Sequence, residues 1–539
     1  MPYRAPVQDC QFILDHVVGL SRVAATDRFA EATPDMTAAI LTEAGRMCDT
    51  VLAPLQRAGD LHPARLENGV LRSSPGFAEG YKAIAEGGWV SIAADPEFGG
   101  MGLPMALTAS VNEMMSAACL SLQLHPLMNL TESQAGSDVG ALATRAEPNG
   151  DGSHAITGQK IYISWGDNDF CENVCHLVLA RLPGGAPGTK GISLFLVPKF
   201  IPDENGAPGR ANDLSVVSLE HKMGMHGSPT CVMQYDGATG WLVGREHDGM
   251  RAMFTMMNNA RLGVGGQGIG VAEAAFQHAL AYAQERRQGR SPIEDGTGTI
   301  IDHADIRRML TVMKAETFAA RAIALDCAVA IDMETATEAP EWAARAALLT
   351  PIAKAFGTDT GIKVADLGVQ VHGGMGYIEE TGAAQYLRDV RVTAIYEGTN
   401  GIQAMDLVAR KLMDGGEAAH ALLDEIEARA EAARARLPDL AEPVWQASET
   451  LREALDWMLA ATDLNQRFAG ATPFLAGFAR VLGGHYHLAA AMAEDSAGAR
   501  THLARFYITR LLPEHQGLLA HATSGADGLY ALSPEDLSA

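Results

Sequence analysis

A change of pattern in the middle of the chain limits what this sequence can fold into. Between residues 128 and 243, short β-branched and aromatic runs such as HAITGQKIYIS, CHLVLARL, GISLFLV and TCVMQY are separated by Gly, Pro, Asn and Asp. Such runs predict an antiparallel β-domain. Before residue 118 and after residue 250, apolar residues recur at three-and-four spacing, which predicts helices. We therefore expect an α+β protein with one β-domain between helical parts.

The length of the chain predicts several domains. Its 539 residues exceed one ordinary core, and typical domain sizes suggest about three or four units. We expect an N-terminal helical domain (1–126), a middle β-domain (127–243), a helical bundle (244–412) and a C-terminal helical extension (413–539). The extension has no catalytic motif, and we interpret it as an interaction helix pair or as simple packing on the core.

Charge and composition exclude some classes of function. The net charge of -24 argues against a general nucleic-acid or anionic-membrane surface, because either would repel the chain. The seven scattered cysteines predict neither a disulfide framework nor a metal site. The first residues lack the basic start and apolar run of a secretory signal, and no stretch reaches about 18 uninterrupted apolar residues. A cytoplasmic protein without a membrane span is the expectation.

The stretch RDVRVTAIYEGTNGIQ is the strongest candidate for chemistry. Glu397 lies between an apolar segment and Gly398, which permits a turn that a Cβ would forbid. A carboxylate held on such a turn can have its pKa raised by desolvation toward the range useful for a base. The structural alternative is that Glu397 caps a helix that begins near Asn400.

Two further stretches allow more than one interpretation. The segment TESQAGSD, residues 131–138, is rich in hydroxyls and backbone donors that could hold a polar heterocycle and a phosphate, but it also suits a solvated loop. The segment GVGGQG, residues 263–268, matches the dinucleotide pattern GxGxxG. No strand signature precedes it, so small residues that allow close helix packing are the better interpretation.

The motifs IYEGTNGIQ, VHGGMGYIEE and MNLTESQAGSD occur in an order that resembles the acyl-CoA dehydrogenase family of flavoproteins, over about residues 12–412. The resemblance implies FAD as cofactor and an acyl-CoA thioester as substrate. It implies Glu397 as the catalytic base that removes the α-proton. It also implies a homodimer in which subunits share flavin contacts, with electron-transferring flavoprotein as the acceptor.

The resemblance also assigns individual residues. Flavin contacts fall on Leu130, Thr131, Ser137, Tyr162, Ile163, Ser164, Arg286, Gln288, Gln370, His372, Gly373, Gly374 and Thr399. Substrate contacts fall on Ser137, Asn258, Arg261 and Glu397. From the residues alone, His372 suits packing equally well, the paired glycines suit a helix stop, and Tyr162 to Ser164 suit an ordinary strand.

The long C-terminal extension resembles that of the longer bacterial members, which favours 3-(methylthio)propanoyl-CoA as substrate. Short-, medium- or long-chain fatty acyl-CoA dehydrogenation, a flavin oxidase and a non-catalytic acyl-CoA or flavin-binding scaffold are the alternatives. The sequence departs from the family pattern after Pro126, where a further helical stretch is normal in relatives and Leu127 follows here at once. That stretch helps to enclose the acyl pocket in relatives, so its absence keeps the scaffold alternative open.

Overall fold

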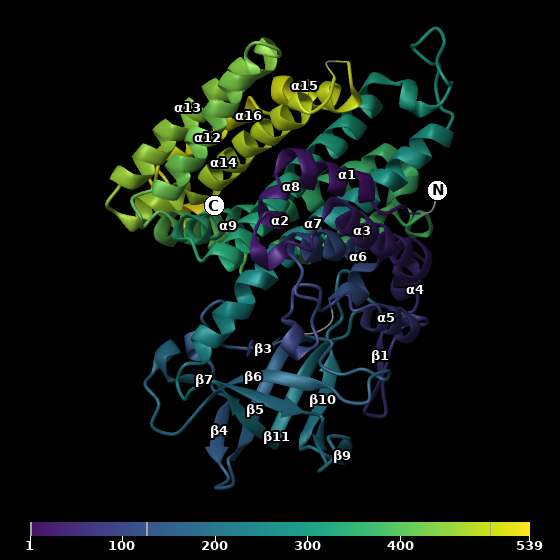
Figure 1. Ribbon diagram of the computed structural model, residues 1–539. Helices are drawn as coiled ribbons and strands as arrows, with labels where there is room; N and C mark the ends of the chain where they lie inside the picture. Colours follow the sequence, from purple (N-terminus) through teal and green to yellow (C-terminus); the bar gives the residue numbers. More distant parts are fainter. Residues whose placement is uncertain (1–2, 125–127, 496) are drawn as a thin grey trace. The chain divides into compact units, whose positions relative to one another are not determined.

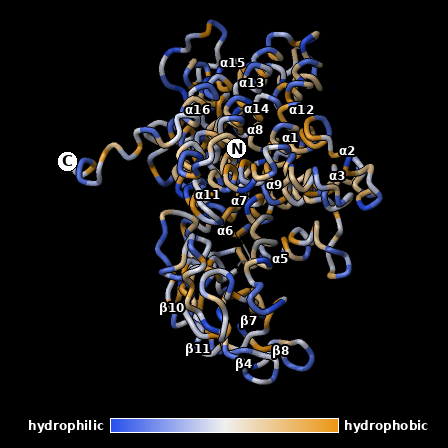
Figure 2. The backbone as a smooth tube through the Cα atoms, turned by 90° about the vertical axis from the view of Figure 1, so that its left-hand side faces the viewer, coloured by the Kyte–Doolittle hydropathy of each residue, from blue (hydrophilic) through white to orange (hydrophobic). Residues whose placement is uncertain are grey.

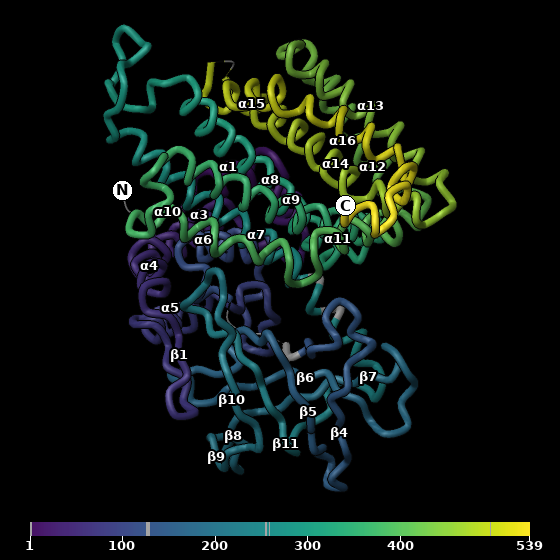
Figure 3. The backbone as a smooth tube through the Cα atoms, turned by 180° about the vertical axis from the view of Figure 1, so that it is seen from behind, coloured from purple at the N-terminus to yellow at the C-terminus, as the bar shows by residue number. Residues whose placement is uncertain are grey.

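The computed structural model describes residues 3–124, 128–495 and 497–539, which form two compact units (Figures 1 and 3). Unit 1 comprises Met1–Thr50, Gly87–Ala118 and Arg261–Ala539, and unit 2 comprises Val51–Glu86 and Cys119–Ala260. The expected departure after Pro126 and the boundary predicted there lie outside the described residues. The described helices and the β-rich middle part confirm the α+β class.

Unit 2 is built on a sheet of seven strands in the order β10-β11-β5-β4-β6-β3, with β7 paired to both β11 and β6. The four predicted strands are present as β5 (Ser153–Ser164), β6 (Cys175–Arg181), β7 (Ile192–Pro198) and β11 (Thr230–Val243). The remaining elements of this unit are β1 (Arg65–Glu67), β2 (Val70–Arg72), β3 (Met128–Asn129), β4 (Arg145–Pro148), β8 (Phe200–Pro202), β9 (Pro208–Ala211), β10 (Leu214–Leu219), α4 (Ala53–Leu61) and α5 (Phe77–Glu86).

The sheet is largely but not wholly antiparallel. The long pair β5 and β11 is antiparallel, from Thr230 opposite Ser164 to Trp241 opposite Ser153. By contrast, β3 and β4 each pair with β6 in parallel. Buried and exposed side chains alternate along parts of these strands, and Figure 2 shows apolar and polar colours mixed along them. Buried side chains of the sheet form one apolar cluster around Phe195 and Tyr235 and a second that joins Leu179 and Leu194 to Met253 of α7 (Gly249–Glu285).

Unit 1 is helical. Its elements before the C-terminal extension are α1 (Val7–Phe12), α2 (Ser21–Ala24), α3 (Pro34–Met47), α6 (Met105–Gln123), α7 (Gly249–Glu285), α8 (Ala304–Thr337), α9 (Pro340–His372), α10 (Ala383–Val390) and α11 (Asn400–Asp406). The ends of α6 and α7 extend beyond the unit boundaries, and α6 loses helical dihedral angles at Cys119. The glycine-rich stretch before α6 contains a short 3-10 turn at Pro96–Phe98.

Glycines bring α7 and α9 into close contact. A methyl group added to Gly265 would lie 2.7 Å from the carbonyl oxygen of Ala353, and one added to Gly361 would lie 2.6 Å from the carbonyl oxygen of Gly268. Real Cβ atoms do not approach backbone that closely, so the helices fit only because these positions lack side chains. The GVGGQG segment is therefore helical and serves helix packing, as predicted.

The extension forms α12 (Glu417–Ala433), α13 (Pro438–Ala460), α14 (Leu464–Met492), α15 (Ala499–Arg510) and α16 (Glu514–Thr523). The helix α14 is buried along most of its length and packs against α8, α15 and α16. The structure therefore supports core packing over a free interaction pair. No helix within the described ranges is both long and apolar enough to cross a membrane.

Candidate functional site

Glu397 lies on a strained turn between two helical segments. Its φ is +54°, in the left-handed region that a residue with a side chain rarely adopts, and Gly398 follows at +86°. The buried side chain of Gln403 pins this turn, because its Nε2 donates to the carbonyl oxygens of Glu397 (3.3 Å) and Gly398 (3.1 Å). The hydrogen bonds from Gln403 thus hold the left-handed backbone of Glu397 in place. A strained backbone persists only where its surroundings fix it in this way.

The helix-cap alternative for Glu397 is wrong. The helix α11 begins at Asn400, and its cap is Thr399, whose hydroxyl accepts from the N–H of Ile402 at 3.3 Å. This leaves the Glu397 carboxylate half-buried and, among the residues described, without a hydrogen bond or ion pair. Thr399, which the family resemblance assigned to the flavin, has this structural role as well.

The electrostatics of the turn suit proton transfer. Burial raises the pKa of the Glu397 carboxyl above its ordinary value, while the positive charges of Lys354 and Arg261 oppose that rise. The Tyr396 hydroxyl donates to Gln267, and burial keeps the pKa of Tyr396 high, so this neighbour remains a neutral donor. A carboxyl with opposing influences of this kind can change its protonation state during a reaction.

Arg261 is brought to the same turn. Its guanidinium is buried and pairs through Nη1 with Asp406 at 2.9 Å. Its Nη2 lies 4.0 Å from where a Cβ on Gly398 would be, and its Nε has no partner within the described residues. The structure thus joins Arg261, Glu397 and Thr399 in one part of unit 1. Asn258 lies in α7, but its side chain is outside the described part.

In unit 2, the TESQAGSD loop is fixed by a buried ion pair that the sequence did not single out. The Glu132 carboxylate binds Lys160 Nζ at 2.8 Å and Thr144 Oγ1 at 2.6 Å. Burial alone would raise the pKa of Glu132, but Lys160 and these hydrogen bonds lower it to about 2. The same Lys160 donates to the carbonyl oxygen of Leu130 at 3.1 Å. The only sequence signal was the position of Glu132 inside the motif.

The loop and the end of β5 lie side by side, since the N–H of Ile161 donates to the carbonyl oxygen of Thr131 at 2.9 Å. Tyr162 has a φ of +60° and is 62% exposed, which a buried strand position would not allow. Ile163 is buried in the sheet, and Ser164 is half-buried. Leu130, Thr131 and Tyr162 to Ser164 are therefore neighbours within unit 2.

The remaining predicted residues lie at helix ends of unit 1. Arg286 and Gln288 are exposed just after α7. Gly373 ends α9 with a φ of +61°, which confirms the helix stop, and Gln370, Gly373 and Gly374 are exposed. His372 is instead buried and stacks on Tyr282, with ring centroids 4.4 Å apart.

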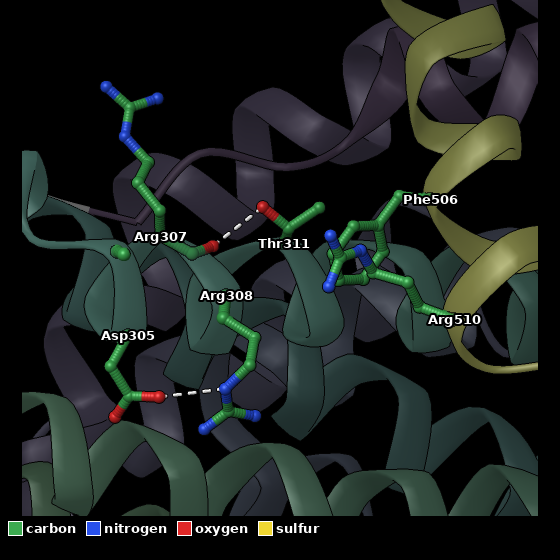
Figure 4. Close-up of a pocket in the computed structure, with 7 residues that line it drawn as sticks. Asp305, Arg307, Arg308, Thr311, Phe506 and Arg510 are labelled. Carbon is green, nitrogen blue, oxygen red and sulfur yellow. Dashed lines mark hydrogen bonds and ion pairs between the residues drawn. The ribbon is translucent and has the colours of Figure 1, made fainter.

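A separate hollow of about 570 Å³ lies where α8 meets α15, and it contains none of the predicted site residues. Figure 4 shows Arg308 directed toward Asp305 and Arg510 lying across Phe506. Arg307 donates through Nε to the carbonyl oxygen of Ile301 at 2.9 Å. These arginines are exposed and partnered, so the hollow has no group prepared for acid or base chemistry.

Known proteins share this architecture over most of its length. Residues 128–238 match the acyl-CoA dehydrogenase middle domain, 247–413 the acyl-CoA dehydrogenase C-terminal domain, and 422–533 the acetyl-CoA dehydrogenase C-terminal-like domain. A 3-methylmercaptopropionyl-CoA dehydrogenase of Ruegeria pomeroyi is 42% identical over 523 residues, which cover 88% of each chain. The chain belongs to the acyl-CoA dehydrogenase family. It is an FAD-dependent oxidoreductase that dehydrogenates acyl-CoA thioesters.

Other members extend the comparison. A broad-specificity linear acyl-CoA dehydrogenase of Mycobacterium tuberculosis is 33% identical, covering 76% of this chain and 75% of that one. Two solved structures share the fold. They are Caenorhabditis elegans ACDH-11 in complex with C11-CoA (TM-score 0.76, 21% identity, 93% of each chain) and a Bacillus anthracis acyl-CoA dehydrogenase with FAD (TM-score 0.72, 20% identity, 94% of this chain and 90% of that one).

The residues of unit 2 fit a flavin. The hydroxyls of Thr131, Ser137 and Ser164 make no side-chain hydrogen bond within the described part of the chain, so they are available to a polar heterocycle. Tyr162 adds an exposed aromatic side chain beside them. Gly136 leaves its surroundings open, since a Cβ there would meet nothing within 4 Å. Donors, acceptors and open space of this kind are what FAD requires.

Proposed function

We propose that this acyl-CoA dehydrogenase oxidises 3-(methylthio)propanoyl-CoA to 3-(methylthio)acryloyl-CoA, the trans-2-enoyl thioester. The observation that carries the choice of substrate is the 42% identity to the Ruegeria pomeroyi protein across 88% of both chains. The match extends far beyond the residues 247–413 of the catalytic helical domain. The Mycobacterium relative, at 33% identity, makes linear acyl-CoA thioesters the second candidate class.

In this proposal Glu397 is the base. The α-proton of a thioester is weakly acidic, so its removal needs a carboxylate placed beside it and a donor for the developing enolate oxygen. The Glu397 carboxylate has no protein partner among the described residues and is therefore available to take the proton. The backbone N–H of Glu397 likewise donates to no acceptor in the described part. We assign this N–H to the thioester carbonyl oxygen.

The remaining site residues keep the assignments that the family resemblance implied. Bound flavin would supply the acceptor for two electrons and the β-hydrogen. The family resemblance assigns to the flavin Leu130, Thr131, Ser137, Tyr162, Ile163, Ser164, Arg286, Gln288, Gln370, His372, Gly373, Gly374 and Thr399. Ser137, Asn258 and Arg261 would hold the substrate. The buried position of His372 favours packing beneath that surface over direct contact.

The proposal includes the surroundings of the enzyme. We assign it to the cytoplasm as a homodimer in which Arg286 and Gln288 reach the flavin of the partner subunit. Electron-transferring flavoprotein would reoxidise the flavin. The four-domain division at residues 126, 243 and 412 is part of the same proposal.

An anaerobic titration tests the substrate. The purified holoenzyme is mixed with 3-(methylthio)propanoyl-CoA, and bleaching of the flavin absorbance is followed. Pentanoyl-CoA is the matched control, because it has a methylene where the thioether has sulfur. Faster bleaching with the thioether at equal, low thioester concentration supports the proposal. A preference for pentanoyl-CoA or longer chains points to the linear acyl-CoA class, and the absence of bleaching with every thioester leaves a binding scaffold.

Reoxidation separates a dehydrogenase from an oxidase on the same fold. The bleached enzyme is exposed to air with and without electron-transferring flavoprotein. Slow recovery of absorbance in air and rapid recovery with the flavoprotein are the expected results. Rapid recovery in air alone would establish an oxidase instead.

A further inference from the structure

Lys354 is a buried cation that the proposed reaction does not use. It lies in α9, it is fully buried, and its Nζ donates to Asn400 Oδ1 at 2.9 Å. Within the described residues this neutral amide is its only direct partner. Burying an ammonium without a paired carboxylate costs free energy, so a position that retains one calls for a functional explanation.

Asn400 connects Lys354 to the turn that carries Glu397. It is the first residue of α11 and follows Thr399 directly. Its Nδ2 donates to Asp359 Oδ1 at 2.7 Å and to Thr358 Oγ1 at 3.0 Å, so its amide is fixed from both ends. The start of α11 is thereby tied to α9, and the turn that precedes it has little freedom to move.

The charges around Lys354 come from several elements. Glu397 and Asp359 are the carboxylates that act on it, and Arg261 is the cation that opposes it. Asp406 is already occupied by Arg261 and Arg410. The more distant groups are Arg391, which acts on Asp359, and Lys411, which acts near Asp406. Of the two carboxylates whose charge acts on Lys354, Asp359 already accepts from Asn400. Glu397 is the one without a direct partner among the described residues.

We propose that Lys354 is a positioning residue for the Glu397 base: it holds Asn400 at the start of α11, directly after the turn, and provides a buried positive charge there. This inference rests on the proposed role of Glu397 and deepens it. A fixed cation here favours the ionised carboxylate before substrate arrives, while the turn holds the carboxylate in place.

The pKa directions agree with this geometry. Burial lowers the pKa of Lys354 to about 8, against the raising effect of Asp359 and Glu397. Lys354 in turn holds the pKa of Glu397 below the value that burial alone would give. Removing the ammonium therefore raises the pKa of Glu397, and a larger share of the base is protonated at any pH on the acidic limb of the activity profile.

The test is the pH profile of kcat/KM for Lys354→Met, Lys354→Gln and Lys354→Arg holoenzymes. For Met and Gln, the acidic limb should move up by about one pH unit, a tenfold loss on that limb, and converge toward wild type at alkaline pH. Lys354→Arg should keep the limb within a few tenths of a unit. Lys363→Met is the matched control, because Lys363 also lies on α9 but pairs with Glu316 at 2.8 Å; its profile should match wild type.

The Lys354→Gln variant keeps a hydrogen-bond donor for Asn400 but carries no charge. It therefore tests the inference even if Lys354→Met fails to fold. An unmoved limb in flavin-loaded Lys354→Gln, or an equal loss at every pH, overturns the inference. Glu397→Gln separates this failure from that of the proposed function. If Glu397→Gln keeps full turnover, the base assignment itself is wrong. If Glu397→Gln is inactive and the Lys354→Gln limb is unmoved, only the role of Lys354 is wrong.

Discussion

At the scale of single residues, the carboxylate of Glu397 is the feature on which the chemistry depends. Replacing Glu397 by Gln preserves the size of the side chain and the left-handed turn but removes the proton acceptor. General-base catalysis contributes roughly 10² to 10⁴ in rate, so we expect a loss of about that size in kcat. Flavin content and the melting temperature should stay near wild type, because the carboxylate has no protein partner in the described part. Stopped-flow flavin reduction measures the chemical step directly.

Glu379→Gln is the control for this substitution. Glu379 is an exposed carboxylate of the same unit that pairs with Arg388 at 2.8 Å. Its loss should leave turnover unchanged, since an exposed ion pair contributes about 1 kcal/mol or less to stability. Wild-type flavin reduction in Glu397→Gln would remove the assignment of the base.

Glu132 gives a second prediction at this scale. Replacing it by Gln leaves the Lys160 ammonium buried without a countercharge, which should cost about 3–5 kcal/mol in the free energy of unfolding. The loop that carries Thr131 and Ser137 should also bind flavin more weakly. Chemical denaturation and flavin retention during gel filtration measure the two effects. Asp151→Asn, in an exposed turn of the same unit, should change unfolding by less than about 1 kcal/mol.

The pH dependence of this effect follows from the pKa of Glu132, which is lowered from 4.5 to about 2 in the folded chain. A group with a lowered folded pKa stabilises the fold above its unfolded value and loses that contribution as the pH falls. The difference between wild type and Glu132→Gln should therefore be complete above about pH 4.5 and disappear toward pH 2. A difference that persists at the acidic end would assign the effect to packing.

At the scale of elements, the contact between α7 and α9 sets the distance between Arg261 and Lys354. Gly265→Ala should lower stability by about 1–3 kcal/mol, because the new methyl group meets the carbonyl oxygen of Ala353. Gly263→Ala is the matched control on the same helix, where a Cβ would meet nothing within 4 Å. Alanine there should stabilise by up to about 1 kcal/mol, since it is the better helix former. Equal melting temperatures in the two variants would contradict close packing.

Helices and strands could be predicted from the sequence where a short stretch carries the whole pattern. The four strands, the helical GVGGQG segment and the helix stop at Gly373 all follow from periodicity or from glycine. The parallel pairing of β3 and β4 with β6 was not predictable, because strand direction depends on contacts between distant segments. Pro351 also contradicts the usual rule that proline ends or kinks a helix, because it is buried inside α9, which continues to His372.

The candidate site was predictable where its residues belong to short motifs. Glu397, Gly398 and Thr399 are consecutive, so their turn could be inferred from the stretch itself. The role of Lys354 could not be inferred, because Lys354 lies on another helix, α9, and no sequence spacing connects it to the turn at Glu397. The cap was assigned to the wrong residue for a related reason. Thr399 and Glu397 both precede α11, and the hydrogen bond from the N–H of Ile402 to the Thr399 hydroxyl identifies Thr399 as the cap.

At the scale of the whole molecule, the C-terminal extension shares a core with the catalytic helices of unit 1. Arg480 of α14 pairs with Glu316 of α8 at 2.7 Å, and the Tyr486 hydroxyl donates to Asp326 of α8 at 2.6 Å. These groups are at most 6% exposed. A chain that ends at residue 412 would expose the α8 surface and would lose the contacts of Glu316 with Arg480 and of Asp326 with Tyr486. Unit 1 should therefore unfold in one transition that includes the extension.

Arg480→Met tests this coupling between the extension and the catalytic helices. The substitution removes a buried cation from Glu316, whose pKa Arg480 and Lys363 lower against the effect of burial, so we expect a loss of about 3–5 kcal/mol in unfolding free energy. Arg505→Met is the matched control, because Arg505 pairs with Asp439 within the extension and is 44% exposed; its loss should cost about 1 kcal/mol or less.

Far-UV circular dichroism and flavin fluorescence are followed together on heating. If Arg480→Met lowers both transitions by the same amount, the extension supports the fold that carries Glu397. If an early helical transition leaves flavin release at its wild-type temperature, the extension is a separate domain whose packing on α8 does not support the site.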